Sequence, residues 1–361
     1  MKKLLSIMLS IIMILTSLLS VGYIALADDD EESKLYYGKY YVGDEYFKYV
    51  TGNDEENDSF EDGYWNDVYP FELYITGYSS GFSRKLVIPD EIDGIEKSVV
   101  YLKDYRYLET VVLSDGILLF ECFDDQGLGK EFADEWVWSK REENNIRYLY
   151  VGKIFSEMSL IDTKRYRSQK LENLEEVHVS EENEKLASVN GIVYTKDLKT
   201  VVFVPEKSTA NLIKEVTEIG DYAYAYCNDR FVSIPKKVKR IGYAAFAHSK
   251  IRTAYINKQI TFIDQYAFDE CKKLEAVWIK GNSKKVFERG AFDRCKKLKE
   301  VYIDSNKIPE FKKHAFRGTK KGIKFYVENK KLAKKLKTAL KKTGVDNAKI
   351  YVDKKLICTK K

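Results

Sequence analysis

The sequence predicts a solenoid of short parallel β-strands stacked into a curved sheet, with a β-rich N-terminal cap and a C-terminal capping helix. Three observations support this class. Residues 268–281 read FDECKKLEAVWIKG, and 24 residues later the chain reads FDRCKKLKEVYIDS, with eight of fourteen positions identical. An Ala-aromatic pair recurs at regular steps, and a pattern typical of an amphipathic helix follows the last copy.

The Ala-aromatic pair gives the period of the repeat. Its steps are 22, 22, 24 and 24 residues, and its five copies are Ala223-Tyr224, Ala245-Phe246, Ala267-Phe268, Ala291-Phe292 and Ala315-Phe316. A fixed period in the twenties is typical of a leucine-rich-repeat solenoid. A unit this short has no core of its own, so it buries its apolar side chains against its neighbours.

Alternation within one repeat predicts which side chains face inward. In a β-strand Val277 and Ile279 point to one side and Trp278 to the other. The interior of one coil is then filled by seven side chains, which are Ile263, Ala267, Phe268, Cys271, Leu274, Val277 and Ile279. Each large apolar side chain contributes about 1.5–3 kcal/mol when buried, so the inward positions are constrained and the outward ones vary.

The pattern I-x-x-x-A-F-x-x-C-x-x-L-x-x-V-x-I resembles the BspA-like family of leucine-rich-repeat surface proteins. Residues 74–78 with 87–94 resemble the opening repeat of that family. Residues 190–194 with 201–205 resemble its embedded hairpin. The resemblance covers about residues 71–355 and implies surface adhesion or protein–protein interaction.

The first residues indicate a secretory signal peptide at residues 1–27. Lys2 and Lys3 form its basic end, an apolar stretch follows, and Ala25-Leu26-Ala27 is a small-x-small cleavage site. An uncleaved membrane anchor is the alternative. With cleavage after Ala27, we expect a secreted or surface-associated chain without a membrane span and without a nucleic-acid partner.

The rest of the chain is predicted to form two caps around an array. Residues 28–70 are acidic and Tyr-rich and are expected to form edge strands over the first coil. Repeats occupy residues 71–327 and are degenerate or interrupted at 115–170. Residues 328–361 form a basic cap, in which leucines on one face of 329–343 predict a helix that closes the apolar end of the last repeat.

Charge is distributed unevenly along the chain. Residues 28–270 contain 30 Lys and Arg against 47 Asp and Glu, whereas residues 271–361 contain 29 against 9. The mature protein is therefore expected to be acidic at its front and basic at its back.

No catalytic or metal-binding constellation emerges, so we expect neither an enzyme nor a cofactor. The three histidines are scattered over separate repeats, and Cys227, Cys271 and Cys295 occupy a slot that Ser249 also fills, which predicts buried packing residues. The spacing C-x-x-C is absent. The acidic run at residues 53–58 is interpreted as a solvated loop or, alternatively, as a calcium loop, although it lacks the glycine of an EF-hand.

The variable outward strand position predicts a binding surface on the concave face. The residues at that position are Tyr150, His178, Ser233, Tyr255, Trp278, Tyr302 and Tyr326. Exposed aromatic side chains bind protein partners and stack on sugars. The alternative is that Tyr and Trp are simply good strand formers.

Paired lysines suggest a second surface. Pairs that recur with the repeat, and that are expected to line up along the outside of the solenoid together with the lysines of the helix, are Lys236-Lys237, Lys272-Lys273, Lys296-Lys297 and Lys312-Lys313, of which the last three are the candidate polyanion site. Such pairs attract an anionic polysaccharide or wall polymer, or they are merely solvated repeat edges. We therefore expect a secreted, non-catalytic adhesion or protein-binding module, with polyanion binding as the alternative and a passive spacer as a third interpretation.

Overall fold

The computed structural model describes residues 35–42, 44–52, 72–78, 82–92, 95–96, 98–102, 108–122, 145–156, 171–228, 232–281 and 283–352. The expected signal peptide at 1–27 and the acidic run at 53–58 lie outside these residues.

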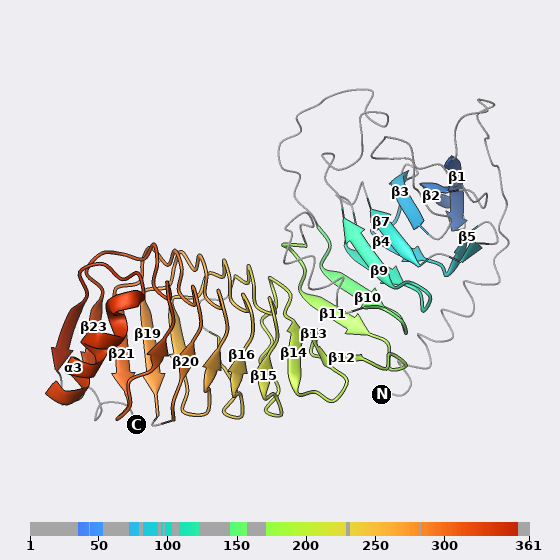
Figure 1. The fold of residues 1–361 in the computed structure, drawn as a ribbon. Helices are drawn as coiled ribbons and strands as arrows, with labels where there is room; N and C mark the ends of the chain where they lie inside the picture. The colour runs from blue at the N-terminus through green and yellow to red at the C-terminus, as the bar shows by residue number, and fades with distance from the viewer. Residues whose placement is uncertain are drawn as a thin grey trace, which may run out of the picture.

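Two sheets run side by side along the C-terminal part of the chain, and their strands are parallel except for the antiparallel first three strands of the second sheet (Figure 1). The first sheet has the longer strands, in the order β17 (Thr253–Ile256), β19 (Ala276–Lys280), β21 (Glu300–Asp304), β23 (Lys324–Val327) and β24 (Lys349–Val352). The second has the order β12 (Leu186–Val189), β13 (Ile192–Thr195), β14 (Thr200–Phe203), β15 (Glu218–Ile219), β16 (Arg240–Ile241), β18 (Phe262–Ile263), β20 (Val286–Phe287) and β22 (Glu310–Phe311). The predicted solenoid of parallel strands is confirmed.

The N-terminal part repeats this plan with two further sheets. One has the order β1 (Leu35–Val42), β2 (Glu45–Gly52), β3 (Glu72–Tyr78), β7 (Val99–Leu102) and β9 (Leu119–Cys122). Its first three strands are antiparallel and its last three are parallel. The other sheet is parallel, in the order β4 (Lys85–Ile88), β8 (Thr110–Leu113), β10 (Tyr148–Val151) and β11 (Glu176–Val179). A short hairpin pairs β5 (Glu91–Ile92) with β6 (Ile95–Glu96).

The described parts of the stretch 115–170 continue both N-terminal sheets. They supply β9 and β10, and Tyr150 of β10 pairs with Val112 on one side and His178 on the other. Val112 and Tyr150 are much farther apart in sequence than one repeat, and residues 123–144 between them lie outside the described residues. This stretch matches the repeat pattern poorly because the spacing between its strands departs from the period, although β9 and β10 still pair with their neighbours.

The hairpin of β13 and β14 separates two hydrophobic cores. Ile192, Tyr194 and Val201 pack into the core of the C-terminal coils, while Val193 and Val202 pack into the core of the N-terminal sheets. Because successive side chains of a strand point to opposite faces, this hairpin contributes to both cores at once.

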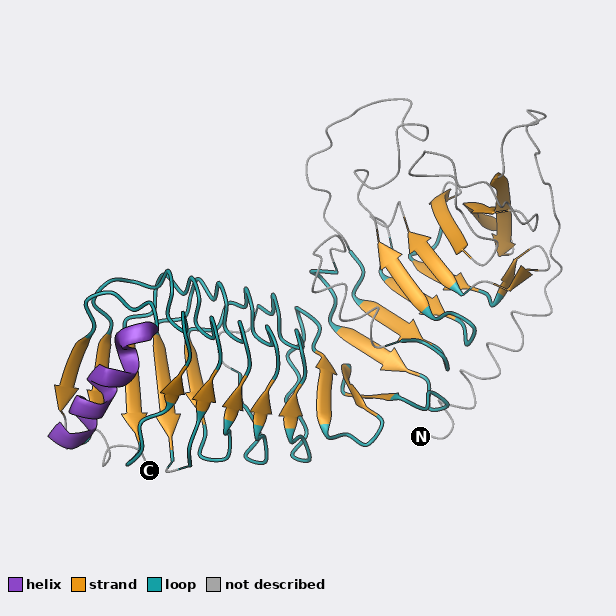
Figure 2. Ribbon diagram, in the orientation of Figure 1, coloured by secondary structure: helices purple, strands orange, loops and turns teal. Residues whose placement is uncertain are grey.

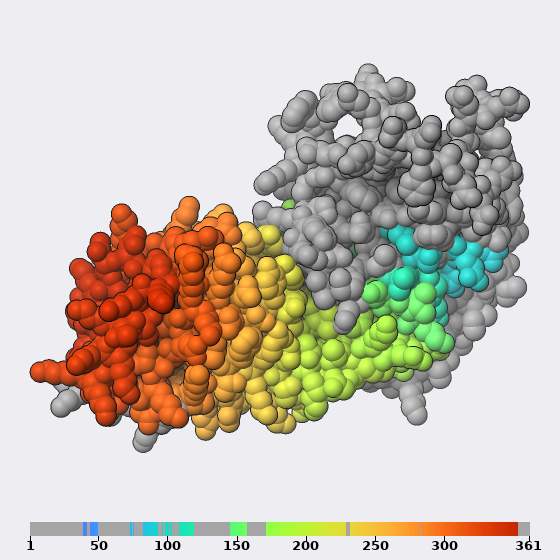
Figure 3. Space-filling model, in the orientation of Figure 1, coloured from blue at the N-terminus to red at the C-terminus, as the bar shows by residue number. Residues whose placement is uncertain are grey.

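Packing inside the coils follows the predicted alternation. The seven side chains predicted to fill one coil are each at most 1% exposed. The rings of the Ala-aromatic pairs stack from coil to coil at centroid distances of 5.0–5.3 Å, in the order Tyr224, Phe246, Phe268, Phe292 and Phe316. In the space-filling view the colour changes gradually along the array, as expected when each coil contacts only its neighbours (Figure 3).

The predicted capping helix is present as α3 (Lys330–Ala339), followed by a 3₁₀ turn at Leu340–Lys342. Asn329 caps its start, since its side-chain oxygen accepts a hydrogen bond from the Leu332 amide. Leu332, Leu336 and Leu340 are buried, and α3 lies at the end of the stack beside β23 and β24 (Figure 2). Among the described residues, no helix has the length and hydropathy needed to cross a membrane.

Candidate functional site

Parallel register aligns four of the six aromatic residues predicted to bind a partner. Tyr255 pairs with Trp278, Trp278 with Tyr302 and Tyr302 with Tyr326. Tyr326 pairs in turn with Tyr351 of β24, which the sequence prediction omitted because β24 follows the helix rather than another Ala-aromatic turn. We call these five side chains the aromatic ladder. The signal that identifies Tyr351 is the shared strand pattern VYI, FYV and IYV.

The central rings of the aromatic ladder stack face to face. Trp278 and Tyr302 have ring centroids 3.9 Å apart and nearly parallel planes, at 10°. The distances are 4.7 Å for Tyr302 and Tyr326 and 5.3 Å for Tyr326 and Tyr351. Rings stacked in this way cover one another's faces, so they present their edges to an incoming partner.

Hydrogen bonds fix the orientation of the two middle tyrosines. Both hydroxyls point to the Glu300 carboxylate, at 2.6 Å from the Tyr302 oxygen and 3.4 Å from that of Tyr326. Burial and then the hydrogen bond to Glu300 raise the pKa of Tyr302, so its hydroxyl stays protonated and donates. These two rings of the ladder are thus oriented before any partner arrives.

The other two predicted aromatic residues lie elsewhere. Tyr150 and His178 stack on each other at 4.5 Å, but they belong to β10 and β11 of a separate sheet. His178 also contacts Glu176 at 2.9 Å. Ser233 is exposed and lies outside any strand. The structure therefore divides the predicted column into the aromatic ladder and a separate pair.

The six predicted lysines are all exposed, but they occupy two positions of the coil. Lys272-Lys273 and Lys296-Lys297 lie in the same turn, and one step of 24 residues further this position holds Lys320-Lys321. Lys312 corresponds instead to Glu288, since their amides donate to the matching carbonyls of Phe287 and Ile263. We call the set Lys272, Lys273, Lys296, Lys297, Lys320 and Lys321 the lysine turns.

Ion pairs neutralise part of this charge. Lys272 lies 3.3 Å from Glu270, and Lys312 lies 2.6 Å from Glu310. Hydrogen bonds from Lys312 and Lys284 lower the pKa of Glu310 to about 2. Lys312 and one member of the lysine turns, Lys272, are therefore each partly neutralised by a nearby carboxylate.

The buried cysteines are held in structural contacts. Among the described residues no cluster of three His, Cys, Asp or Glu side chains is placed to hold a metal ion. Cys227, Cys271 and Cys295 are buried, as the slot predicted, and none of these three thiols is in a disulfide. The thiols of Cys271 and Cys295 each donate to a carbonyl of the preceding coil at 3.0 Å.

Comparison with known proteins identifies the repeat. Residues 206–332 match the BspA type leucine rich repeat region in six copies. No protein of the curated collection matches the chain.

Three solved structures are similar to this chain. A leucine-rich repeat protein from Eubacterium ventriosum has a TM-score of 0.41 and 15% identity, over 77% of this chain and 84% of that one. The pneumococcal vaccine antigen PcpA has a TM-score of 0.34 and 14% identity, over 85% and 97%. A leucine rich cell surface protein from Faecalibacterium prausnitzii has a TM-score of 0.29 and 12% identity, over 79% and 95%.

Proposed function

Residues 206–332 of this chain belong to the BspA type leucine-rich repeat family, and we propose that the protein is a non-catalytic module that binds a protein partner through the aromatic ladder. It acts outside the cell, secreted or attached to a bacterial surface. The signal-peptide pattern at residues 1–27 and the family to which the repeats belong support this location.

The observation that carries the proposal is the partly exposed row of five aromatic side chains in neighbouring strands, four of which stack on one another. Tyr255 and Tyr351, at its two ends, are 42% and 41% exposed. Aromatic side chains dominate binding energies at protein interfaces, and rings that are already ordered lose little entropy on binding. Because the inner rings offer edges rather than faces, the ladder fits apolar and aromatic side chains of a protein better than the faces of sugar rings.

Charged side chains flank the ladder and give the surface specificity. The register places Glu300, Lys324 and Lys349 in one row beside it, and Lys280 with Asp304 in a row on its other side. A surface of aromatic centre and mixed-charge rim is typical of a protein interface.

A protein array and a glycan array probed with the purified mature chain test the proposal. We expect a protein ligand whose binding is abolished in the double variant Trp278→Ala, Tyr302→Ala. The matched control is Tyr150→Ala with His178→Ala, which removes a stacked pair from another sheet and leaves binding unchanged. A protein ligand that binds both variants equally well contradicts the proposal.

The lysine turns support a second candidate function, binding of an anionic polysaccharide or wall polymer. Three successive copies place two exposed lysines each at the same point of the coil, and exposed charges at this spacing attract a polyanion. Replacement of Lys272, Lys273, Lys296 and Lys297 by Gln is expected to abolish salt-sensitive binding of heparin. Replacement of Lys312 and Lys313 by Gln is the control and weakens it less.

A further inference from the structure

A groove of about 420 Å³ lies over the turns that carry the Ala-aromatic pairs, in a different segment of the coil from the aromatic ladder. Its floor is formed by small side chains, those of Ala244 and Ala247, and both residues are buried. This volume lies within the range of about 300–1,000 Å³ that is typical of small-molecule sites. No residue of the aromatic ladder or of the lysine turns lines it.

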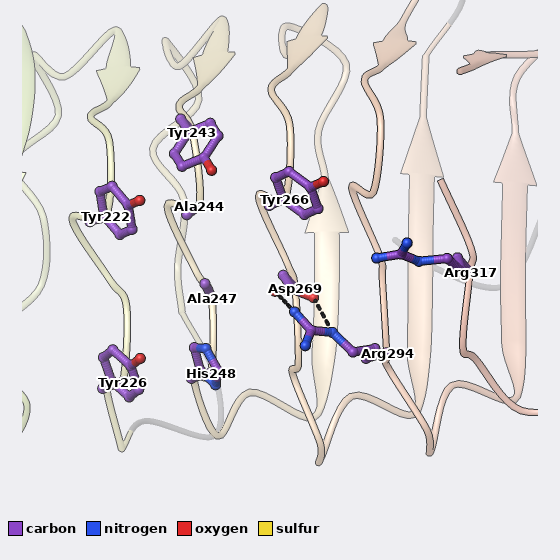
Figure 4. A pocket seen from close by; sticks show the side chains of 10 residues that line it. All are labelled: Tyr222, Tyr226, Tyr243, Ala244, Ala247, His248, Tyr266, Asp269, Arg294 and Arg317. Atoms are coloured by element: carbon purple, nitrogen blue, oxygen red, sulfur yellow. Dashed lines mark hydrogen bonds and ion pairs between the residues drawn. The ribbon is translucent and has the colours of Figure 1, made fainter. Parts of the chain in front are cut away.

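Two rows of rings form the sides of the groove (Figure 4). Tyr222, Tyr243 and Tyr266 make one row, and Tyr226 with His248 makes the other. The first row is not stacked, since successive planes meet at 60° and 74° with centroids 5.5 and 5.9 Å apart. In such edge-to-face contacts the edge of one ring covers only part of its neighbour's face, so this row leaves more of its faces uncovered than the parallel stack of the aromatic ladder. Tyr226 and His248 of the second row are stacked in parallel, at 4.7 Å and 6°.

The end of the groove is polar and its charges are balanced. Arg294 donates to the buried Asp269 carboxylate at 2.6 and 3.3 Å, and Arg317 donates to the buried Asp293 carboxylate. Asp269, Arg294 and Arg317 line the groove, and both guanidinium groups remain exposed. A third carboxylate, that of Glu270, lies 2.6 Å from Arg294 and is also paired with a lysine of its own turn, so the end of the groove has hydrogen-bonding groups but little net charge.

The backbone positions of these rings normally favour glycine. Tyr222, Tyr226, His248 and Tyr266 have φ values of 56°, 63°, 60° and 58°. The equivalent positions of the other repeats also have positive φ, and they hold Ala244, Glu270, Gly290, Arg294, His314 and Gly318. Positive φ is therefore a regular feature of this turn, and glycine can replace a ring there without a steric penalty. Gly290 also leaves room for the Tyr266 ring, since a Cβ there meets it at 2.6 Å.

We infer that this groove binds a neutral oligosaccharide. Aromatic faces pack against the C–H groups of sugar rings, while the carboxylate and guanidinium groups at the end exchange hydrogen bonds with hydroxyls. Balanced charge favours a neutral sugar over an acidic one. The site is independent of the proposed function, because it uses other residues and another segment of each coil.

Titration of the purified protein with maltohexaose, cellohexaose and chitohexaose, followed by saturation-transfer NMR and calorimetry, tests the inference. At least one of these sugars is expected to bind. The double variant Tyr222→Gly, Tyr266→Gly removes two rings and relieves the left-handed backbone, so it folds and binds at least tenfold more weakly. Each single variant shows a smaller loss.

The control variant is His314→Gly, which makes the same change in the same slot (φ 62°) outside the groove and leaves the affinity unchanged. Binding of none of the three sugars, or an equal loss in the control, overturns the inference. So does sugar binding that disappears in Trp278→Ala, Tyr302→Ala, because the aromatic ladder is then the sugar site. Failure of the protein array leaves this result untouched, since the two experiments use different ligands and variants.

Discussion

Lys285 is a charged side chain buried without a carboxylate. It is 1% exposed, and its ammonium group donates to the carbonyls of Asn257 and Ile260 at 3.0 and 2.5 Å and to the Ser283 hydroxyl at 3.4 Å. Burial lowers its pKa from 10.5 to about 8. Below pH 8 both folded and unfolded chains hold the proton, whereas between about pH 8 and 10.5 only the unfolded chain does. Stability contributed by this residue therefore rises with pH across that window.

Lys285→Met isolates this effect. The free energy of unfolding of the wild-type protein relative to the variant is expected to increase by about 2 kcal/mol between pH 7.5 and 9.5, because one pKa unit corresponds to 1.36 kcal/mol. Urea titrations of both proteins at the two pH values measure it. A constant difference contradicts a lowered pKa for Lys285.

Neighbouring residues 277 and 278 test the inward and outward assignment. Val277 is fully buried and Trp278 is partly exposed. Val277→Asp leaves a carboxylate without a partner in the core, so we expect a loss of several kcal/mol, with a much smaller loss for Trp278→Asp. Thermal melts of the two variants measure these losses of stability, and equal losses disprove the assignment of Val277 as inward and Trp278 as outward.

At the scale of one element, α3 shows what a cap contributes to a stack. Its leucines cover the last coil, where Phe325 is fully buried, and the hydrogen bond that the Leu332 amide donates to Asn329 orders its first turn. Asn329→Ala is expected to cost about 1 kcal/mol, and Leu336→Ala about 2–5 kcal/mol. Hydrogen exchange in β23 and β24 should accelerate in both variants. Unchanged exchange in Leu336→Ala means that α3 does not protect the stack.

The same helix shows how far sequence reasoning reaches. Its leucine period predicted the buried face correctly, because that pattern depends only on neighbours within one helix. Alternation likewise predicted Val277 and Ile279 inside. Tyr351 was missed, since its place beside Tyr326 depends on how the chain returns after α3. Lys312 and Lys313 were grouped with Lys272-Lys273 and Lys296-Lys297, although they lie at another point of the coil. Recurrence of lysine pairs along the sequence does not show which point of the coil each pair occupies.

The groove was beyond prediction for a related reason. Its tyrosines lie at 222, 243 and 266 and do not share one repeat position, since Tyr243 precedes the slot that Ala244 fills. Their common surface arises from ring angles between coils and from the small side chains of Ala244 and Ala247. Neither property is a regular pattern in the sequence.

Across the whole molecule, the two cores share only a few elements, among them the β13–β14 hairpin. In a solenoid each repeat contacts only its neighbours. A packing defect is therefore expected to destabilise the core in which it lies and not the other core. Leu298→Ala, in the C-terminal core, is expected to accelerate amide exchange there and leave the N-terminal strands unchanged. Leu149→Ala is the matched change in the other core. Exchange that accelerates equally in both parts contradicts two separable cores.

The close stack of Trp278 with Tyr302 also has an optical consequence. Rings that lie parallel at 3.9 Å have coupled electronic transitions, and Trp278 is the only tryptophan among the described residues. Near-ultraviolet circular dichroism of the array should therefore contain a component that arises from the alignment of adjacent coils and that is absent from a single coil. The intensity of that band therefore reports whether β19 and β21 remain paired in register, and no attached label is needed.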